Sequence, residues 1–374
     1  MSVDIYKRYK LEITTLSPIH VGDGNKLTPL EYLRRGNTIH VVSEDRFFEE
    51  LVRHRLVERF INYVEKIRDA SLEGFLRDAK LGVPERILKY SREVLSRSVK
   101  SKQISTFIKN AEGKAYVPGS EIKGAVRIAL LHSILEREPT KTSIIIDMLK
   151  RGLPNEDDLM RPRIREPQGD LGRLVRFSDS NPVDRIAVVQ TYRVSTRLAN
   201  PVPLTLTEVI PHNVSMEASL TLVSTGKITG EVGGPISVQD IVEACRRKAE
   251  KVVELEGRRI QKMVQGAPTH SAWTMLKDFY RNLLDELKQC MGLETILRVG
   301  GGQGLYSTTL LSALIDDEKF KEVIRTGRGK RFNKLRSLLL SDSMVGARPY
   351  NVKVVDVDGG FMPLGWVKVV FKEA

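Results

Sequence analysis

Residues 297–305 read Leu-Arg-Val-Gly-Gly-Gly-Gln-Gly-Leu, and this is the most unusual stretch of the chain. Four glycines within residues 300–304 lose much conformational entropy on folding, so a globular protein rarely carries them without a reason. Without a Cβ atom, the backbone can pass close to another chain, or successive N–H groups can point at one phosphate. A helix beginning near residues 307–309 would add its positive end. The segment predicts close contact with a polyanion; the alternative, a flexible surface connection, is disfavoured by the apolar helical patterns on both sides.

Two familiar nucleotide-binding motifs do not fit the chain. The dinucleotide fingerprint GxGxxG fails because Leu305 stands where the third glycine is required. Residues 119–124 have the glycine spacing of a Walker A loop, but Ala125 and Val126 replace the Lys-Ser/Thr pair that holds phosphate and magnesium. The sequence therefore favours a polymer over a nucleotide, and we expect no cofactor.

The charge balance points to the same kind of partner. The 374 residues include 60 Lys and Arg against 47 Asp and Glu, a net charge of +13. Such an excess favours a polyanion, because neutralising phosphates releases counterions. A length of 374 residues favours two domains. No apolar run approaches the roughly 20 residues that span a bilayer, so we expect a cytoplasmic protein without membrane contact.

Metal binding is not supported by the sequence. The two cysteines, Cys245 and Cys290, lie in separate helical patterns, with no CxxC spacing and no neighbouring histidine. A zinc site needs about four ligands at short spacing. We therefore expect no metal, and we interpret both cysteines as small buried side chains.

A second candidate site lies at the start of a predicted helix that runs from Gly119 to about Leu135. Ser120 is a suitable N-cap, and Lys123 and Arg127 are four residues apart on one face. A helix start with two cations can seat a phosphate. The alternative is a pair of solvated surface cations.

A third candidate is His20, which lies in a turn-rich segment with Gly22 and Gly24. Histidine titrates near neutrality and could act as an acid or base in RNA cleavage. The sequence offers no second obligate partner for such chemistry. A histidine that binds RNA or caps a turn is the commoner interpretation.

Hydrophobic periodicity predicts a mixture of strands and helices. Residues 46–110 are strongly charged and mostly helical in period, and an arginine-rich loop at 160–176 leads to a domain boundary near 177–184. The two halves are compatible with diverged copies of one α+β unit. Strands are expected at 10–16, 38–42, 185–194, 204–209 and 215–222, helices at 237–265 and 271–291, and a hairpin of 349–357 with 364–371 through the turn 358–360.

Three segments together resemble the RAMP superfamily of CRISPR proteins. They are residues 11–24 (Leu-Glu-Ile-Thr-Thr-Leu-Ser-Pro-Ile-His-Val-Gly-Asp-Gly), residues 116–127 (Tyr-Val-Pro-Gly-Ser-Glu-Ile-Lys-Gly-Ala-Val-Arg) and residues 297–305. Their order and spacing are most similar to the fifth subunit of the type III-A (Csm) complex. The likeness extends over nearly the whole chain, but residues 46–110 match no motif.

The resemblance implies a fold and a division of the chain. The expected fold class is α+β, with two ferredoxin-like (RRM-like) RAMP domains and helical insertions. We expect an N-terminal domain at residues 1–180, with a helical insertion at about 46–110, and a C-terminal domain at 181–374 that carries the glycine-rich loop.

The resemblance also implies a function. It is that of a non-catalytic subunit that binds CRISPR RNA, caps the end holding the 3′ part of that RNA, and supports its maturation. The implied partners are CRISPR RNA and the neighbouring backbone subunit, with target RNA as a further candidate. An alternative within the superfamily is a metal-independent endoribonuclease that cuts precursor CRISPR RNA and depends on His20. The residues expected to contact RNA are His20, Ser120, Lys123, Arg127, Arg298, Gly300, Gly301, Gly302, Gln303 and Gly304.

Overall fold

A computed structural model describes residues 6–137, 174–195, 200–223, 236–266, 271–328 and 351–374, together with the single positions 143, 333 and 336. The predicted arginine-rich loop at 160–176 lies outside these residues up to position 173. Its last two positions belong to strand β7 (Val175–Phe177).

One sheet has five strands in the order β11-β14-β1-β10-β7. Its central strand β1 (Tyr6–Thr15) alternates between buried side chains such as Leu11 and Ile13 and more exposed ones, as the sequence predicts. β1 pairs antiparallel with β10 (Ser215–Val223) and with β14 (Trp366–Glu373), and β14 pairs with β11 (Glu294–Arg298). The N-terminal strand thus lies between two strands from the second half of the chain.

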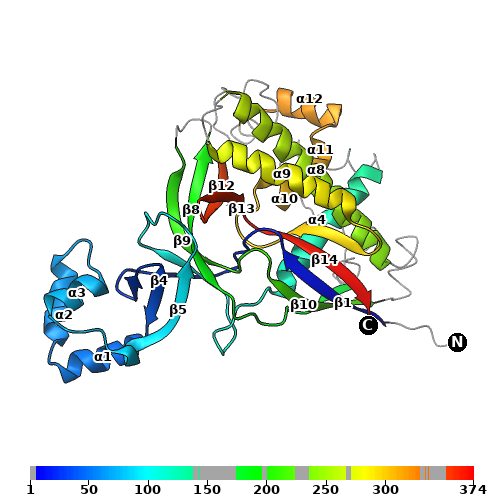
Figure 1. Cartoon of the computed structure of the whole chain (residues 1–374). Coiled ribbons are helices and arrows are strands. Elements are labelled where there is room, and N and C mark those ends of the chain that lie inside the picture. Colours follow the sequence, from blue (N-terminus) through cyan, green and yellow to red (C-terminus); the bar gives the residue numbers. More distant parts are fainter. Residues whose placement is uncertain are drawn as a thin grey trace.

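The second sheet contains nine strands and curves away from the first (Figure 1). Its main path is β2-β6-β9-β8-β5-β4-β3, and β12 joins β8 and carries β13. Each sheet therefore contains strands from before and after residue 180. The division into domains at that residue stays a prediction. The bounds are β2 (Gly22–Leu27), β3 (Tyr32–Arg35), β4 (Thr38–Val42), β5 (Leu88–Val94), β6 (Ile104–Phe107), β8 (Ala187–Ser195), β9 (Val202–Val209), β12 (Asn351–Val357) and β13 (Gly360–Pro363).

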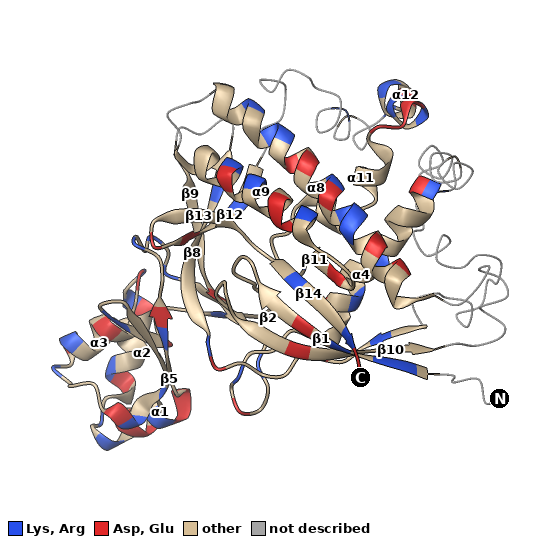
Figure 2. Ribbon diagram, turned by 45° about the vertical axis from the view of Figure 1, so that its right-hand side comes forward, with Lys and Arg blue, Asp and Glu red and all other residues tan. Residues whose placement is uncertain are grey.

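Long helices cover the sheets. α4 (Gly119–Arg137) and α8 (Val238–Gly266) pack on each other and contribute to a core with the five-stranded sheet. α9 (Ser271–Gln289) lies beside α8 and contacts β13 (Figure 1). Basic and acidic residues are interleaved along α8 and α9 (Figure 2). No helix among the described residues is long and apolar enough to cross a bilayer.

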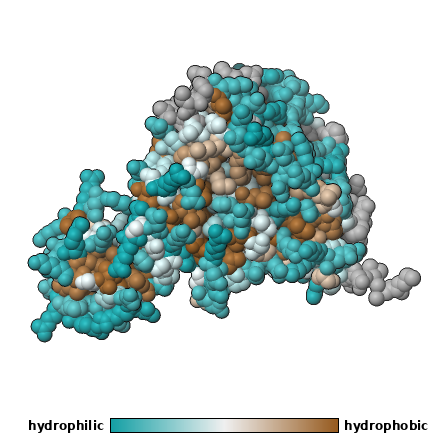
Figure 3. Space-filling model, in the orientation of Figure 1, coloured by the Kyte–Doolittle hydropathy of each residue, from teal (hydrophilic) through white to brown (hydrophobic). Residues whose placement is uncertain are grey.

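A small helical lobe projects from the rest of the molecule (Figure 1). It is formed by α1 (Glu44–Arg53), α2 (Val57–Lys66) and α3 (Leu72–Asp78), followed by the 3-10 turn η1 (Glu85–Ile87), and it has its own hydrophobic cluster. Apolar side chains gather on its visible face (Figure 3). The predicted helical insertion at 46–110 is therefore wrong in its second part, because residues 88–107 supply strands β5 and β6.

Two further corrections concern the C-terminal half. The predicted turn is present, with Asp358 and Gly359 at φ of 52° and 87°, as a tight hairpin requires. However, β12 pairs across it with β13, and β14 leaves to join the five-stranded sheet. The helix expected from residue 307 is broken into α10 (Leu305–Thr308), α11 (Leu311–Leu314) and α12 (Glu318–Thr326).

Candidate functional site

The glycine-rich loop (residues 300–304) follows β11 and meets the two other sequence motifs. The backbone N–H of Gly301 donates to the carbonyl oxygen of His20 at 2.7 Å. The N–H of Gly300 donates to Oε2 of Glu121, in the first turn of α4, at 3.2 Å. Segments near residues 20, 120 and 300 are thus assembled into one site, as the companion motifs of the sequence suggest.

The loop is tightly packed, so it is not a loose connection. Gly300 has a φ of +78°, and a Cβ atom there would lie 2.4 Å from the carbonyl oxygen of His20. Gly302 has a φ of +80°, and its Cβ would lie 2.9 Å from Cδ1 of Leu364. The side-chain amide of Gln303 donates to the carbonyl of Gly300 at 2.7 Å and closes the loop. Part of the need for glycine is therefore internal to the chain.

Arg298 supports the loop from the protein side. Its side chain is 4% exposed, and its guanidinium forms an ion pair with Glu256 at 3.3 Å. It also donates to the carbonyl of Leu364 at 2.9 Å and to that of Gly302 at 3.5 Å. The sequence predicts Arg298 as an RNA contact, which stays a prediction; in the structure its donors meet protein acceptors and hold the glycine-rich loop in place.

The Glu256 carboxylate is buried as well and also accepts a hydrogen bond from the hydroxyl of Tyr280, on α9. Burial raises the pKa of Tyr280 far above its usual value, so the hydroxyl remains a donor. Tyr280, Glu256 and Arg298 form a buried chain of polar contacts from α9 to the glycine-rich loop.

His20 lies against β9 and is half-buried. Its Nδ1 is 2.8 Å from the carbonyl oxygen of Glu208. Because a carbonyl can only accept, Nδ1 carries the proton and Nε2 is left as an acceptor. Burial lowers the pKa of His20 from its usual value, and the neighbouring Lys353 acts in the same direction. The ring is therefore neutral and held in place.

A buried carboxylate that sequence reasoning missed lies beside His20. Glu208 is 1% exposed and accepts from the backbone N–H of Phe107 at 2.9 Å and from the ammonium group of Lys109. Arg92 lies 3.6 Å away. These contacts join β5, β6 and β9 below the His20 segment; an acid in an otherwise alternating strand was the only sequence signal.

The start of α4 differs from its prediction in one respect. The helix begins at Gly119, whose N–H donates to Oδ1 of Asp179 at 2.8 Å, so a residue distant in sequence caps it. Ser120 is exposed in the first turn and is not the N-cap residue. Lys123 and Arg127 are half-buried on the same helix.

A cleft of about 360 Å³, here called the basic cleft, adjoins the glycine-rich loop. Residues 302–306 form one wall, and β8, β9, α8 and β12 form the others. Three cations that sequence reasoning missed line it: Arg193, Arg259 and Lys353. Arg259 lies 4.6 Å from the ring of Tyr306. Arg193 lies on β8, Lys353 on β12 and Arg259 on α8, so these cations reach the loop only when segments distant in sequence assemble.

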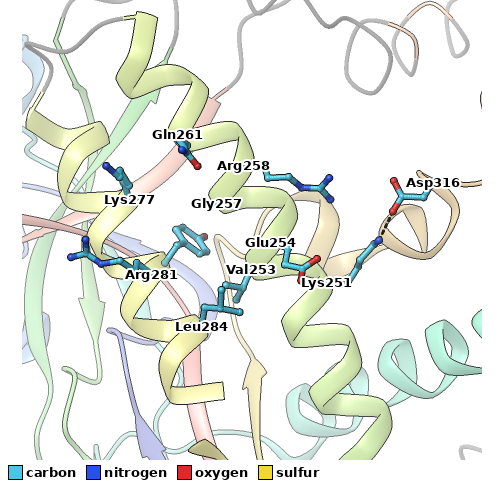
Figure 4. Close-up of a pocket in the computed structure, with 11 residues that line it drawn as sticks. Lys251, Val253, Glu254, Gly257, Arg258, Gln261, Lys277, Arg281, Leu284 and Asp316 are labelled. Atoms are coloured by element: carbon cyan, nitrogen blue, oxygen red, sulfur yellow. Dashed lines mark hydrogen bonds and ion pairs between the residues drawn. The ribbon is translucent and has the colours of Figure 1, made fainter. Parts of the chain in front are cut away.

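A larger hollow of about 660 Å³, here called the outer groove, lies between α8 and α9 (Figure 4). Its rim carries Arg258, Lys277 and Arg281 but also the acids Glu254 and Asp316, the latter paired with Lys251. Tyr280 lies at its floor and connects it to the glycine-rich loop through Glu256. Its mixed charge makes it the weaker of the two candidates for a polyanion.

These features define an α+β protein with a rigid glycine-rich loop beside a basic cleft. Residues 12–307 match the model of the RAMP superfamily, so the chain belongs to that superfamily. The predicted membership and the predicted α+β class are confirmed.

The curated relatives agree with the more specific resemblance. The CRISPR system Cms protein Csm5 of Streptococcus thermophilus is 27% identical over 246 residues, which cover 61% of this chain and 68% of that protein. Csm5 of Enterococcus italicus is 25% identical over 151 residues, covering 34% of this chain and 43% of its own length.

Two solved structures share the fold. One is a chain of a Csm–crRNA–target RNA ternary complex from a type III-A CRISPR–Cas system, with a TM-score of 0.70 and 23% identity, covering 97% of this chain and all of that one. The other is T. onnurineus Csm5, with a TM-score of 0.64 and 22% identity, covering 95% and 99%.

Proposed function

We propose that this chain is a Csm5-type subunit of a type III-A CRISPR complex that binds CRISPR RNA without cutting it. It would cap the end that holds the 3′ part of the RNA, support maturation of that end and contact a neighbouring backbone subunit. Target RNA in a Csm complex is the further partner that one solved relative suggests. The observation that carries the proposal is the rigid glycine-rich loop, whose residues 302–304 open on the basic cleft.

The charges of the basic cleft favour a phosphate backbone. Its one acid, Glu256, is paired with Arg298, while Arg193, Arg259 and Lys353 add three further positive charges to the lining. Backbone contacts of this kind tolerate any sequence, so base pairing would carry the specificity of the complex.

A non-catalytic role is favoured by the surroundings of His20. The ring is neutral, its Nδ1 is bound to the Glu208 carbonyl, and Nε2 lies close to Gly22, 3.1 Å from the position of a Cβ atom there. Cleavage at a 2′-OH needs a base within about 3 Å of that hydroxyl. Among the described residues, the His20 side chain hydrogen-bonds only to the Glu208 carbonyl, so no second acid–base group is bound to the ring.

The test is RNA binding by the purified chain with labelled guide RNA in EDTA. We expect binding to weaken steeply between about 50 and 200 mM salt while the RNA stays intact. A flat salt dependence contradicts a phosphate-dominated contact. Site-specific cleavage of precursor RNA that is lost on His20→Ala would instead establish the endoribonuclease alternative.

A further inference from the structure

Two exposed leucines line the basic cleft. Leu204, on β9, and Leu305, directly after the glycine-rich loop, are each 39% exposed, and both belong to its lining. A single exposed leucine needs no explanation. Two in one hollow, beside three cations, form an amphipathic surface that neither the fold nor the phosphate contacts require.

The glycine-rich loop brings hydrogen-bond donors to the same cleft. The N–H groups of Gly302, Gln303 and Gly304 have no acceptor among the described residues, whereas those of Gly300 and Gly301 are bound. Positive φ values at Gly302 and Gly304 keep this part of the backbone bare of side chains that would cover it. Unpaired successive N–H groups suit phosphate or ribose oxygens.

The size and charge of the cleft restrict the ligand. About 360 Å³ lies at the lower end of the range of small-molecule sites, roughly 300–1,000 Å³, and fits one nucleotide. A stacked helical stretch would keep its bases away from Leu204 and Leu305. A base turned out of the stack would bury apolar surface against them while its phosphates meet Arg193, Arg259 and Lys353.

We infer that the basic cleft is a subsite for one unstacked nucleotide of the bound RNA, with its base against Leu204 and Leu305 and its backbone on residues 302–304. This inference rests on the proposed function, because it specifies how the same RNA is held. The subsite accepts any base, since apolar contact with two leucines does not read hydrogen-bonding edges.

Guide RNAs with 2-aminopurine at successive single positions test the inference, because this base fluoresces when it leaves the stack. We expect one position to brighten on binding. The double variant Leu204→Ala/Leu305→Ala should weaken binding about threefold to tenfold and reduce that brightening. Met291→Ala is the matched control, because Met291 is 77% exposed but does not line the cleft; it should bind as the wild type does.

An abasic site at the brightened position separates the base from the backbone. RNA with the abasic site should bind the wild-type chain more weakly than intact RNA does. The double-leucine variant should bind the two RNAs equally well. Salt-dependent binding with no brightened position, and with both leucines dispensable, overturns the subsite and leaves the proposed function standing. Failure to bind RNA at all overturns both.

Discussion

The backbone N–H of Gly301 donates a 2.7 Å hydrogen bond to the carbonyl oxygen of His20. His20 lies between β1, in the five-stranded sheet, and β2, in the other sheet, while Gly301 follows β11 of the five-stranded sheet. The contact therefore fixes the glycine-rich loop at the passage from one sheet to the other. Since the neighbouring Gly300 almost touches the same carbonyl, this junction tolerates little change.

Gly300→Ala should destabilise the fold. The new Cβ would lie 2.4 Å from the His20 carbonyl oxygen, and the residue must keep a φ of +78°, so we expect a loss of about 1–3 kcal/mol or more in the free energy of unfolding. Gly301→Ala is the control, because its Cβ would meet only ordinary contacts at 3.5 Å. Urea unfolding of both variants checks this, and equal stability would contradict the packing described here.

The Glu256–Arg298 pair gives a second prediction. Arg298→Met leaves a buried carboxylate without its cation, and breaking such a pair costs about 3–5 kcal/mol. Adding Glu256→Gln removes the buried charge and keeps an acceptor for the Tyr280 hydroxyl, so the double variant should be more stable than Arg298→Met alone. Thermal unfolding of the wild type, the two single variants and the double variant measures the coupling free energy between Arg298 and Glu256. A double variant less stable than the single one would argue against the buried pair.

Lys123 and Arg127 remain predicted phosphate contacts. Replacing both with alanine should reduce the slope of log affinity for guide RNA against log salt by about 1–2. Lys277→Ala/Arg281→Ala is matched in charge and in helical spacing but lies at the outer groove. We expect this control to leave the slope unchanged. A reduced slope in Lys277→Ala/Arg281→Ala and an unchanged slope in the α4 variant would indicate that RNA binds at the outer groove and not at α4.

Local sequence patterns predicted those strands and helices that can be recognised from their own hydrophobic periodicity, whichever elements they pack against. The alternation in β1 and the long apolar stripes of α8 and α9 determine those elements wherever they pack. The turn at Asp358 and Gly359 was predicted for the same reason, because both positions need positive φ values. Which strand returns from that turn is a non-local choice, and it was predicted wrongly.

The site shows the same limit. Its glycines were evident from the sequence. The other two motifs, near residues 20 and 120, each accept a direct hydrogen bond from the glycine-rich loop. Arg193 and Lys353 reach the loop only because β8 and β12 pair across about 160 positions of sequence. Arg298 remains a predicted RNA contact, and its ion pair with Glu256 could not be predicted because a whole helix separates the two residues in sequence.

The last prediction concerns acid stability and His132, on α4. The ring is 0% exposed, and neither nitrogen has a hydrogen-bond partner in the structure. Burial, assisted by Lys248 and Lys251, lowers the pKa of His132 to about 3, although Glu136 lies 3.6 Å away. The positive neighbours and the loss of water outweigh this half-exposed carboxylate.

The sign of the effect follows from proton uptake. An unfolded histidine binds a proton near pH 6.5, whereas folded His132 does not, so its contribution to stability is complete above that pH and is lost as the pH falls toward 3. We expect this residue alone to cost up to about 1.4 kcal/mol per pH unit below pH 6. His132→Leu should flatten the fall in the unfolding midpoint between pH 6.5 and 5, and His54→Gln, at an exposed site, should not. The lowered pKa of His20 acts in the same direction, but His20 is present in the wild type and in both variants. The difference in pH dependence between the wild type and His132→Leu therefore reports on His132. An unchanged acid dependence in His132→Leu would show that His132 takes up its proton while folded.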